Sequence, residues 1–105
     1  MTPTSKKTTI RQIQHAACAH FRIGRRDMLS ESRMAHLVEP RHVAMYLSRK
    51  IAGGSWEQIG RAFNRDHTTP VHAVHKIEAQ IADGSISTLQ SLAAIEAQLG
   101  GADYA

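Results

Sequence analysis

A polar cluster in the second half of the chain, Arg65-Asp66-His67-Thr68-Thr69, holds the side chains best suited to recognition chemistry. These side chains are short hydrogen-bond donors and acceptors, and threonine adds a methyl group, so together they can distinguish base edges in DNA. The same residue types also begin ordinary helices, with Asp66 as the cap, Thr68 and Thr69 following it, and His67 in solvent. The spacing alone leaves both interpretations open, a base-reading surface and a plain capped helix.

Metal binding and catalysis fit this region less well. His67, His72 and His75 follow an i, i+5, i+8 spacing that does not place all three on one helical face, and Cys18 is the only cysteine. Asp66 and His67 are adjacent, and neighbours in a helix do not face each other. We therefore predict no metal site, no cofactor and no enzymatic activity.

Two short helices within residues 55–82 are expected to position the polar cluster. Ser55 and Gln58 form the Ser-x-x-Gln pattern of a capping box, which marks a helix start. Apolar residues recur at helical spacing before the cluster (Trp56, Ile59, Ala62, Phe63) and after it (Val71, Val74, Ile77, Ile81). This arrangement predicts a helix-turn-helix, whose second helix can lie in the major groove of DNA.

The remaining elements are also expected to be helical. Thr9 and Gln12 form a capping-box pair at the start of a first helix, and residues 25–29 suit a short second one. Pro40 suits the first position of a long helix that ends at Gly53-Gly54. A last helix is expected from the Ser87–Gln90 pair to Gly100-Gly101. We predict one all-α domain over residues 9–99, a small helical bundle, with flexible tails at 1–8 and 100–105.

Charge is distributed unevenly along the 105 residues. The chain has 13 Lys and Arg against 9 Asp and Glu, for a net charge of +4. Most of the positive charge lies in residues 1–50, whereas residues 83–105 contain acids and no base. A basic half favours a polyanionic partner such as DNA, although it also serves solubility. The lone cysteine and the absence of a signal peptide or an apolar membrane-spanning run favour a cytoplasmic protein.

Several motifs together resemble the C-terminal DNA-binding domain of DnaA, the bacterial replication initiator. They are Pro40-Arg41-His42-Val43-Ala44-Met45-Tyr46-Leu47, Ser55 with Ile59-Gly60-Arg61 and Phe63, the polar cluster, and His72-Ala73 with Lys76-Ile77. The resemblance runs in order from about Thr9 to Ile81. It implies a Trp-repressor-like helical fold that binds double-stranded DNA at DnaA-box-like sites, as a nucleoid-associated and most simply monomeric protein.

The resemblance also implies roles for individual residues. Asp66, His67, Thr68 and Val71 match the family's major-groove base contacts, and Arg33 matches an arginine that enters the minor groove. The matching phosphate contacts are Arg41, His42, Ser55, Trp56, Thr69, His72 and Lys76. Arg33 can equally be an ordinary loop arginine.

Three departures from the family pattern bear on specificity. Glu31, Ala35 and Glu39 occupy positions that are often basic, and the turn is one residue shorter than usual. Pro70 replaces a β-branched residue; it suits the first helical position if Thr69 is the cap but loses a hydrogen bond if Asp66 is.

No phosphate loop of an ATPase module is present in the sequence, so we expect either an excised C-terminal domain or a free-standing protein made of it. The distinct N-terminal residues, the less basic loop and the acidic last helix favour a free-standing protein, of a bacterium or phage, that regulates replication or transcription by occupying sites. The alternative is a helix-turn-helix protein-interaction module that has lost specific DNA readout.

Overall fold

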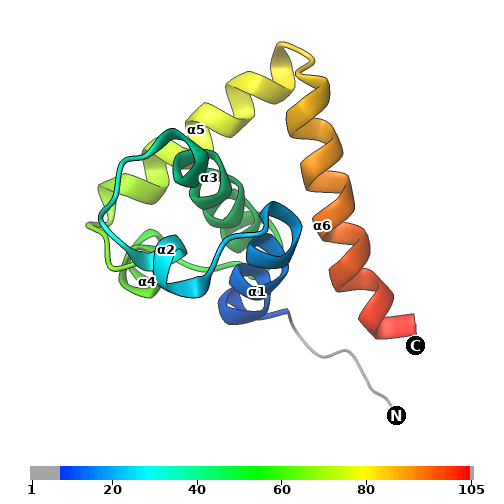
Figure 1. The fold of residues 1–105 in the computed structure, drawn as a ribbon, viewed down its shortest axis with the longest axis horizontal. Helices are drawn as coiled ribbons and strands as arrows, with labels where there is room; N and C mark the ends of the chain where they lie inside the picture. The colour runs from blue at the N-terminus through cyan, green and yellow to red at the C-terminus, as the bar shows by residue number, and fades with distance from the viewer. Residues whose placement is uncertain (1–7, 105) are drawn as a thin grey trace.

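The computed structural model describes residues 8–104, with side chains for residues 8–100, and contains only helices in this part of the chain. The helices are α1 (Ile10–Phe21), α2 (Arg25–Leu29), α3 (Ala35–Lys50), α4 (Trp56–Ala62), α5 (Thr68–Ala82) and α6 (Ile86–Tyr104) (Figure 1). The all-α prediction is confirmed. The tail predicted at the N-terminus lies, except for Thr8, outside the described residues.

Helix α3 is the central element, because it contacts each of the other five helices. Its buried apolar residues include Val43, Ala44, Met45 and Leu47. The largest fully buried apolar side chains come from all six helices and the turn after α4: Ile13, Met28, Met45, Leu47, Ile59, Phe63, Ile77 and Ile95. One continuous core therefore supports both helices of the helix-turn-helix.

The two capping boxes predicted for the first helix and for the helix-turn-helix are both formed. The hydroxyl of Thr9 accepts from the Gln12 backbone N–H (3.1 Å), and that of Ser55 accepts from the Gln58 N–H (3.1 Å). Each glutamine side chain accepts in return from the backbone N–H of its cap residue, at 2.9 Å. Caps of this type contribute about 1 kcal/mol to helix stability, so local sequence fixes where α1 and α4 begin.

The start of α3 differs from the prediction. The helix begins at Ala35, five residues before Pro40, and Pro40 lies inside it with its ring buried. A proline at this position removes the hydrogen bond to the carbonyl of His36. His36 is exposed, so water can hydrate that carbonyl. Burial of the Pro40 ring and of Leu37 offsets the missing bond, which is why a pattern based on proline alone misplaced the helix start.

The last helix also differs at both ends. It begins at Ile86, where the hydroxyl of Ser85, not that of Ser87, accepts from the Thr88 backbone N–H (3.3 Å). It continues through Gly100 and Gly101 to Tyr104, since glycine lowers helix stability without preventing the helical backbone. Helix α6 packs along α1 and buries Leu92 and Ile95 in the core. Over the described residues, no helix combines the length and apolar character needed to cross a lipid bilayer.

Candidate nucleic-acid interface

The turn between α4 and α5 folds back tightly onto α4. The Arg65 backbone N–H donates to the Gly60 carbonyl over 2.7 Å, and Asn64 adopts the left-handed conformation (φ 57°), which asparagine tolerates better than most residues. A Cβ at position 60 would lie 2.8 Å from the Arg65 carbonyl oxygen, closer than real Cβ atoms come. Gly60 therefore allows this close approach, and the buried Phe63 fixes the turn to the core.

The start of α5 resolves the question raised by Pro70. His67 is the N-cap, without a side-chain capping bond, so Thr68 is the first helical residue and Pro70 the third. The third position is one of those whose N–H has no partner within the helix, so proline costs no helical hydrogen bond there. Asp66 and Thr69 were the two alternatives predicted for the N-cap, and neither of them is the N-cap of α5. The helix starts between the two alternatives, and Thr68 is helical.

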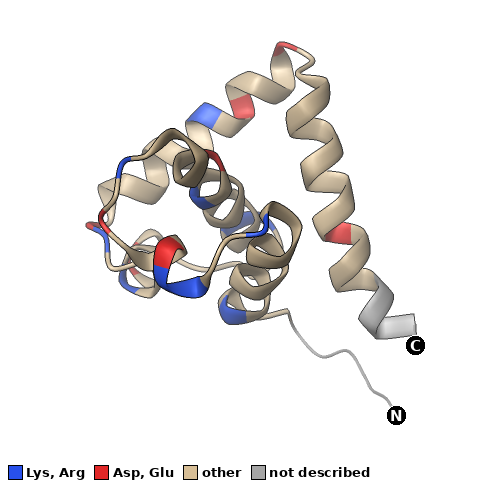
Figure 2. Ribbon diagram, in the orientation of Figure 1, with Lys and Arg blue, Asp and Glu red and all other residues tan. Residues whose placement is uncertain are grey.

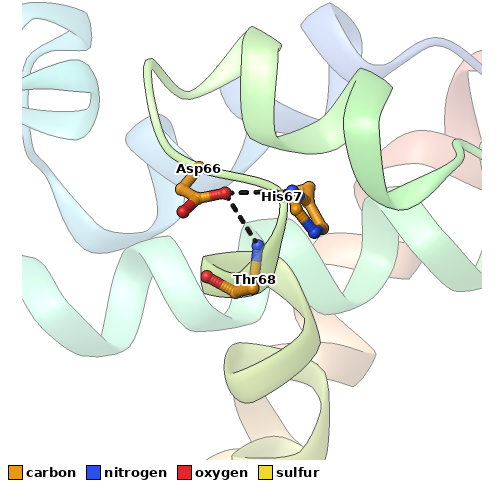
Figure 3. A network of polar contacts seen from close by, with 3 residues as sticks. All are labelled: Asp66, His67 and Thr68. Atoms are coloured by element: carbon orange, nitrogen blue, oxygen red, sulfur yellow. Dashed lines mark hydrogen bonds and ion pairs between the residues drawn. The ribbon is translucent and has the colours of Figure 1, made fainter.

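Asp66 orders the residues that follow it (Figure 3). Its Oδ1 atom lies 3.0 Å from Nδ1 of His67 and accepts a long hydrogen bond, 3.5 Å, from the Thr68 backbone N–H. Asp66, His67 and Thr68 are all exposed, whereas Thr69 and Val71 are half-buried. The capping interpretation is therefore partly correct, and it leaves the same three side chains exposed at the N-terminal end of α5.

The opposite side of α5 holds this end in place. Ala73, Val74 and Ile77 are buried against the core, and α5 packs mainly on α3. His72 and Lys76 are exposed, at positions one and two helical turns beyond Thr68. One predicted base contact, Thr68, and two predicted phosphate contacts, His72 and Lys76, thus lie on one exposed side of α5.

A groove of about 580 Å³ brings several predicted site residues together. This groove, called here the cluster groove, is lined by Arg33, Arg41, His42, Arg65, Asp66 and Thr69, and Glu31 also lines it. Its walls come from the loop before α3, from α3 itself and from the helix-turn-helix. The pairing of Arg33 with the polar cluster, which the sequence places more than thirty residues apart, is a result of the fold.

Arg41 does not occupy the position expected of a phosphate contact. Its side chain is buried, with 5% of its surface exposed, and its guanidinium donates to acceptors within the protein. Nε donates to the Met28 carbonyl (3.0 Å), and Nη2 to the Asp27 carbonyl (2.7 Å) and the Ser30 hydroxyl (2.9 Å). Nη1 donates to the Ser32 carbonyl. These bonds take up four of the five N–H donors of Arg41 and give its guanidinium a role inside the protein, so the phosphate contact of Arg41 stays a prediction.

His42 lies where the cluster groove meets a second groove of about 560 Å³, which Arg33, Lys76, Gln80 and Ser87 also line. Burial, together with the positive charges of Lys76 and Arg41, lowers the pKa of His42 below its ordinary value of 6.5. At neutral pH this imidazole is mostly uncharged and can donate a single hydrogen bond. Arg33, Arg41 and Lys76 nevertheless place positive charge around His42, although Glu31 and Glu39 also line the two grooves.

Ser55 and Trp56 lie at the far end of α4, about 10 Å along the helix from the turn. The guanidinium of Arg49 stacks on the Trp56 ring (4.1 Å from Cζ to the ring centroid) and donates to the Gly54 carbonyl (3.0 Å). A positive charge is thus fixed beside a capped helix N-terminus, a combination suited to phosphate. Sequence reasoning missed Arg49, because nothing in its spacing links it to Trp56.

Charged residues are sparse on α6. Between Ile86 and Gly100, Glu96 is the only charged residue of α6, whereas Lys and Arg recur on the other elements (Figure 2). Among the described side chains, no group of three or more His, Cys, Asp and Glu residues could hold a metal ion. Lys and Arg therefore lie on α1 to α5 and on the segments that connect them, and α6 has none between Ile86 and Gly100.

Comparisons with known proteins agree with this architecture. A family model described as the bacterial DnaA protein helix-turn-helix matches residues 10–77. The chromosomal replication initiator protein DnaA of Sphingopyxis alaskensis is 43% identical over 95 residues, which cover 89% of this chain and 20% of that protein. DnaA of Bartonella quintana is 45% identical over 80 residues, 75% of this chain and 16% of that protein.

The chain thus spans a fifth or less of the length of these curated relatives. The matched segment contains α1 to α4 and most of α5, including the polar cluster and the cluster groove. From this match and from the helix-turn-helix seen in the structure, the chain belongs to the family of the helix-turn-helix domain of bacterial DnaA proteins.

Proposed function

We propose that this protein binds double-stranded DNA sequence-specifically, at sites resembling DnaA boxes, and regulates replication initiation or transcription by occupying them. The observation that carries the proposal is the exposure of Asp66, His67 and Thr68 at the N-terminal end of α5. Membership of the DnaA helix-turn-helix family supports it, since the relatives are named replication initiators.

In this mechanism the N-terminal end of α5 enters the major groove and reads base edges there. Asp66 accepts a hydrogen bond from a cytosine amino group, and Thr68 places its methyl group against a thymine methyl. His67 and Val71 complete the contact surface. The Oδ1 contacts of Asp66 with His67 and the Thr68 N–H orient its carboxylate before DNA arrives, so little side-chain freedom is lost on binding.

The flanking residues hold the phosphates on either side. Thr69, His72 and Lys76 extend along α5, and His42 faces Lys76 from α3. Ser55 and Trp56, with Arg49 beside them, form a further contact at the N-terminus of α4. Arg33, exposed in the loop before α3, enters the adjacent minor groove, where a narrow A·T-rich segment has a strongly negative potential.

The proposal is tested by fluorescence anisotropy of a labelled duplex containing a DnaA box, against a scrambled duplex of the same composition. Specific binding requires at least ten-fold tighter association with the box, together with an affinity that falls steeply as salt rises. Equal, salt-sensitive binding to both duplexes would reduce the function to non-specific DNA binding.

The alternative is a protein-interaction module without DNA readout. Two observations favour it: Asp66 already has partners within the protein, and Glu31 places a negative charge in the cluster groove. This function predicts no binding of either duplex at low salt. The same titration, repeated with Asp66→Asn and Thr68→Ala, therefore separates the two functions.

A further inference from the structure

The loop that connects α2 to α3, residues 30–34, is held by two arginines from different parts of the fold. Arg41 reaches it from α3 and Arg65 from the turn of the helix-turn-helix. This loop carries Arg33 and forms one wall of the cluster groove. The two arginines therefore connect the segment that presents Arg33 with the segment that presents the polar cluster.

Arg41 makes the larger set of bonds. Besides Ser30 and Ser32 in the loop, its guanidinium binds the Met28 and Asp27 carbonyls at the end of α2. One planar side chain thus spans the last turn of α2 and the first half of the loop. Because Arg41 is buried within the central helix, this end of the loop is fixed to the core.

Arg65 holds the same loop from the other side. Its Nη2 donates to the Ser30 carbonyl over 2.7 Å, while the Ser30 hydroxyl binds Arg41. Two guanidinium groups therefore converge on one serine. Burial, followed by repulsion from Arg65, lowers the pKa of Arg41, with Asp27 acting in the opposite direction. The arrangement persists because each guanidinium is supplied with oxygen acceptors.

The loop also has bonds of its own. The Ser30 hydroxyl donates to the Asp27 carbonyl (3.0 Å) and accepts from the Ser32 N–H (3.3 Å), and the Ser32 hydroxyl accepts from the Met34 N–H (3.3 Å). These bonds surround Arg33 on both sides along the chain. The backbone N–H groups on both sides of Arg33 are therefore hydrogen-bonded within the loop, whereas the Arg33 side chain is exposed.

We propose that Arg41 and Arg65 are positioning residues that fix the 30–34 loop. Arg33 and the polar cluster are then held at a fixed distance from each other when they meet DNA. The proposal rests on the proposed function, because it gives Arg33 a DNA contact. It assigns Arg41 an indirect role in place of a phosphate contact. With the loop already ordered, binding does not have to restrict its backbone, and the free energy of that contact is retained.

Arg41→Lys and Arg65→Lys test the proposal, since lysine keeps the charge but loses the planar fork of donors. Each variant is combined with Arg33→Ala in a double-mutant cycle, and binding to the box duplex is measured. We expect each lysine variant to weaken binding about ten-fold in the natural background and less than two-fold when Arg33 is absent. Arg26→Lys, at an exposed site on α2, is the matched control and should leave binding unchanged.

A phosphate contact by Arg41 gives a different result. Lysine also binds phosphate, so Arg41→Lys would lose little affinity, and its effect would add to that of Arg33→Ala. Additive effects for both lysine variants overturn the positioning role. Arg65 is half-buried and not in the core. Arg65→Lys therefore still tests the proposal if Arg41→Lys lowers the stability of the whole domain.

A measurement without DNA separates this proposal from the proposed function. Amide hydrogen exchange in the free protein should become at least ten-fold faster at Ser32 and Met34 in both lysine variants, and stay unchanged in core amides such as that of Leu47. Unchanged exchange at Ser32 and Met34 refutes the positioning role whatever binds. If the natural protein binds no duplex while exchange accelerates, the proposed function fails and the fixing of the loop stands.

Discussion

The carbonyl oxygen of Arg65 lies so close to Gly60 that a Cβ atom added to Gly60 would be 2.8 Å from it. The obstructing atom belongs to the backbone of the turn, which the 2.7 Å bond between the Arg65 N–H and the Gly60 carbonyl holds in place. We predict that Gly60→Ala lowers the free energy of unfolding by about 1–3 kcal/mol, the usual range for overpacking. Chemical denaturation followed by circular dichroism measures it.

Gly100→Ala is the matched control for this prediction. Gly100 is also helical, but a Cβ there meets no atom within 4 Å. Alanine is the better helix former by about 1 kcal/mol, so Gly100→Ala should leave stability unchanged or raise it. Equal effects of the two substitutions would show that helix propensity, and not the close approach of the turn, governs position 60.

The two capping boxes allow the structural and the binding role of Ser55 to be separated. Thr9→Ala and Ser55→Ala each remove one side-chain cap, so each should lower stability by about 1 kcal/mol. Thr9 begins α1, outside the proposed DNA contacts, whereas Ser55 begins α4 beside Arg49 and Trp56. We expect only Ser55→Ala to weaken DNA binding, measured by anisotropy at a temperature where both variants are folded. Equal affinities of the two variants would remove Ser55 from the interface.

Local patterns predicted the fold well where a short-range interaction determines it. Thr9 with Gln12 and Ser55 with Gln58 placed two helix starts correctly, because the partners of each box are three residues apart in sequence. Pro40 misled the prediction of α3, since its position inside the helix depends on burial of its ring. The extension of α6 beyond Gly100 was missed for a related reason, as glycine only weakens a helix.

The candidate site was predicted less completely, because its geometry depends on contacts between distant residues. The exposure of Thr68 follows from its position on α5, which helical periodicity indicates. The burial of Arg41 does not, because its acceptors at residues 27–32 lie 9–14 positions away along the chain. Arg65 was likewise assigned to the polar cluster, although its guanidinium turns back to Ser30.

His42 should make stability depend on pH. Its pKa in the folded protein is below the ordinary value of 6.5, so the unfolded chain takes up the proton more readily. The contribution of His42 to the free energy of unfolding is therefore fully present above about pH 6.5, and it is lost as the pH falls through the pKa of His42 in the folded protein. We predict that His42→Gln flattens the decrease of unfolding free energy in this window, measured by denaturant titrations at successive pH values.

Thr68 and Lys76 should differ in what they contribute to recognition, although both are exposed on α5. Thr68→Ala removes a base contact, so it should relax the preference at one base pair by about 1–3 kcal/mol and leave the salt dependence unchanged. Lys76→Ala removes a phosphate contact, so it should weaken all duplexes alike and reduce the slope of log K against log salt by about 1.

Anisotropy titrations at several salt concentrations, with duplexes that vary one base pair at a time, measure both quantities. Lys50→Ala is the control for Lys76, because Lys50 pairs with Glu78 at 3.6 Å on the exposed surface and has no proposed DNA contact. Its salt slope should stay close to that of the natural protein. A reduced slope for Thr68→Ala, or a changed base preference for Lys76→Ala, would mean that α5 meets DNA with a different side than the one proposed.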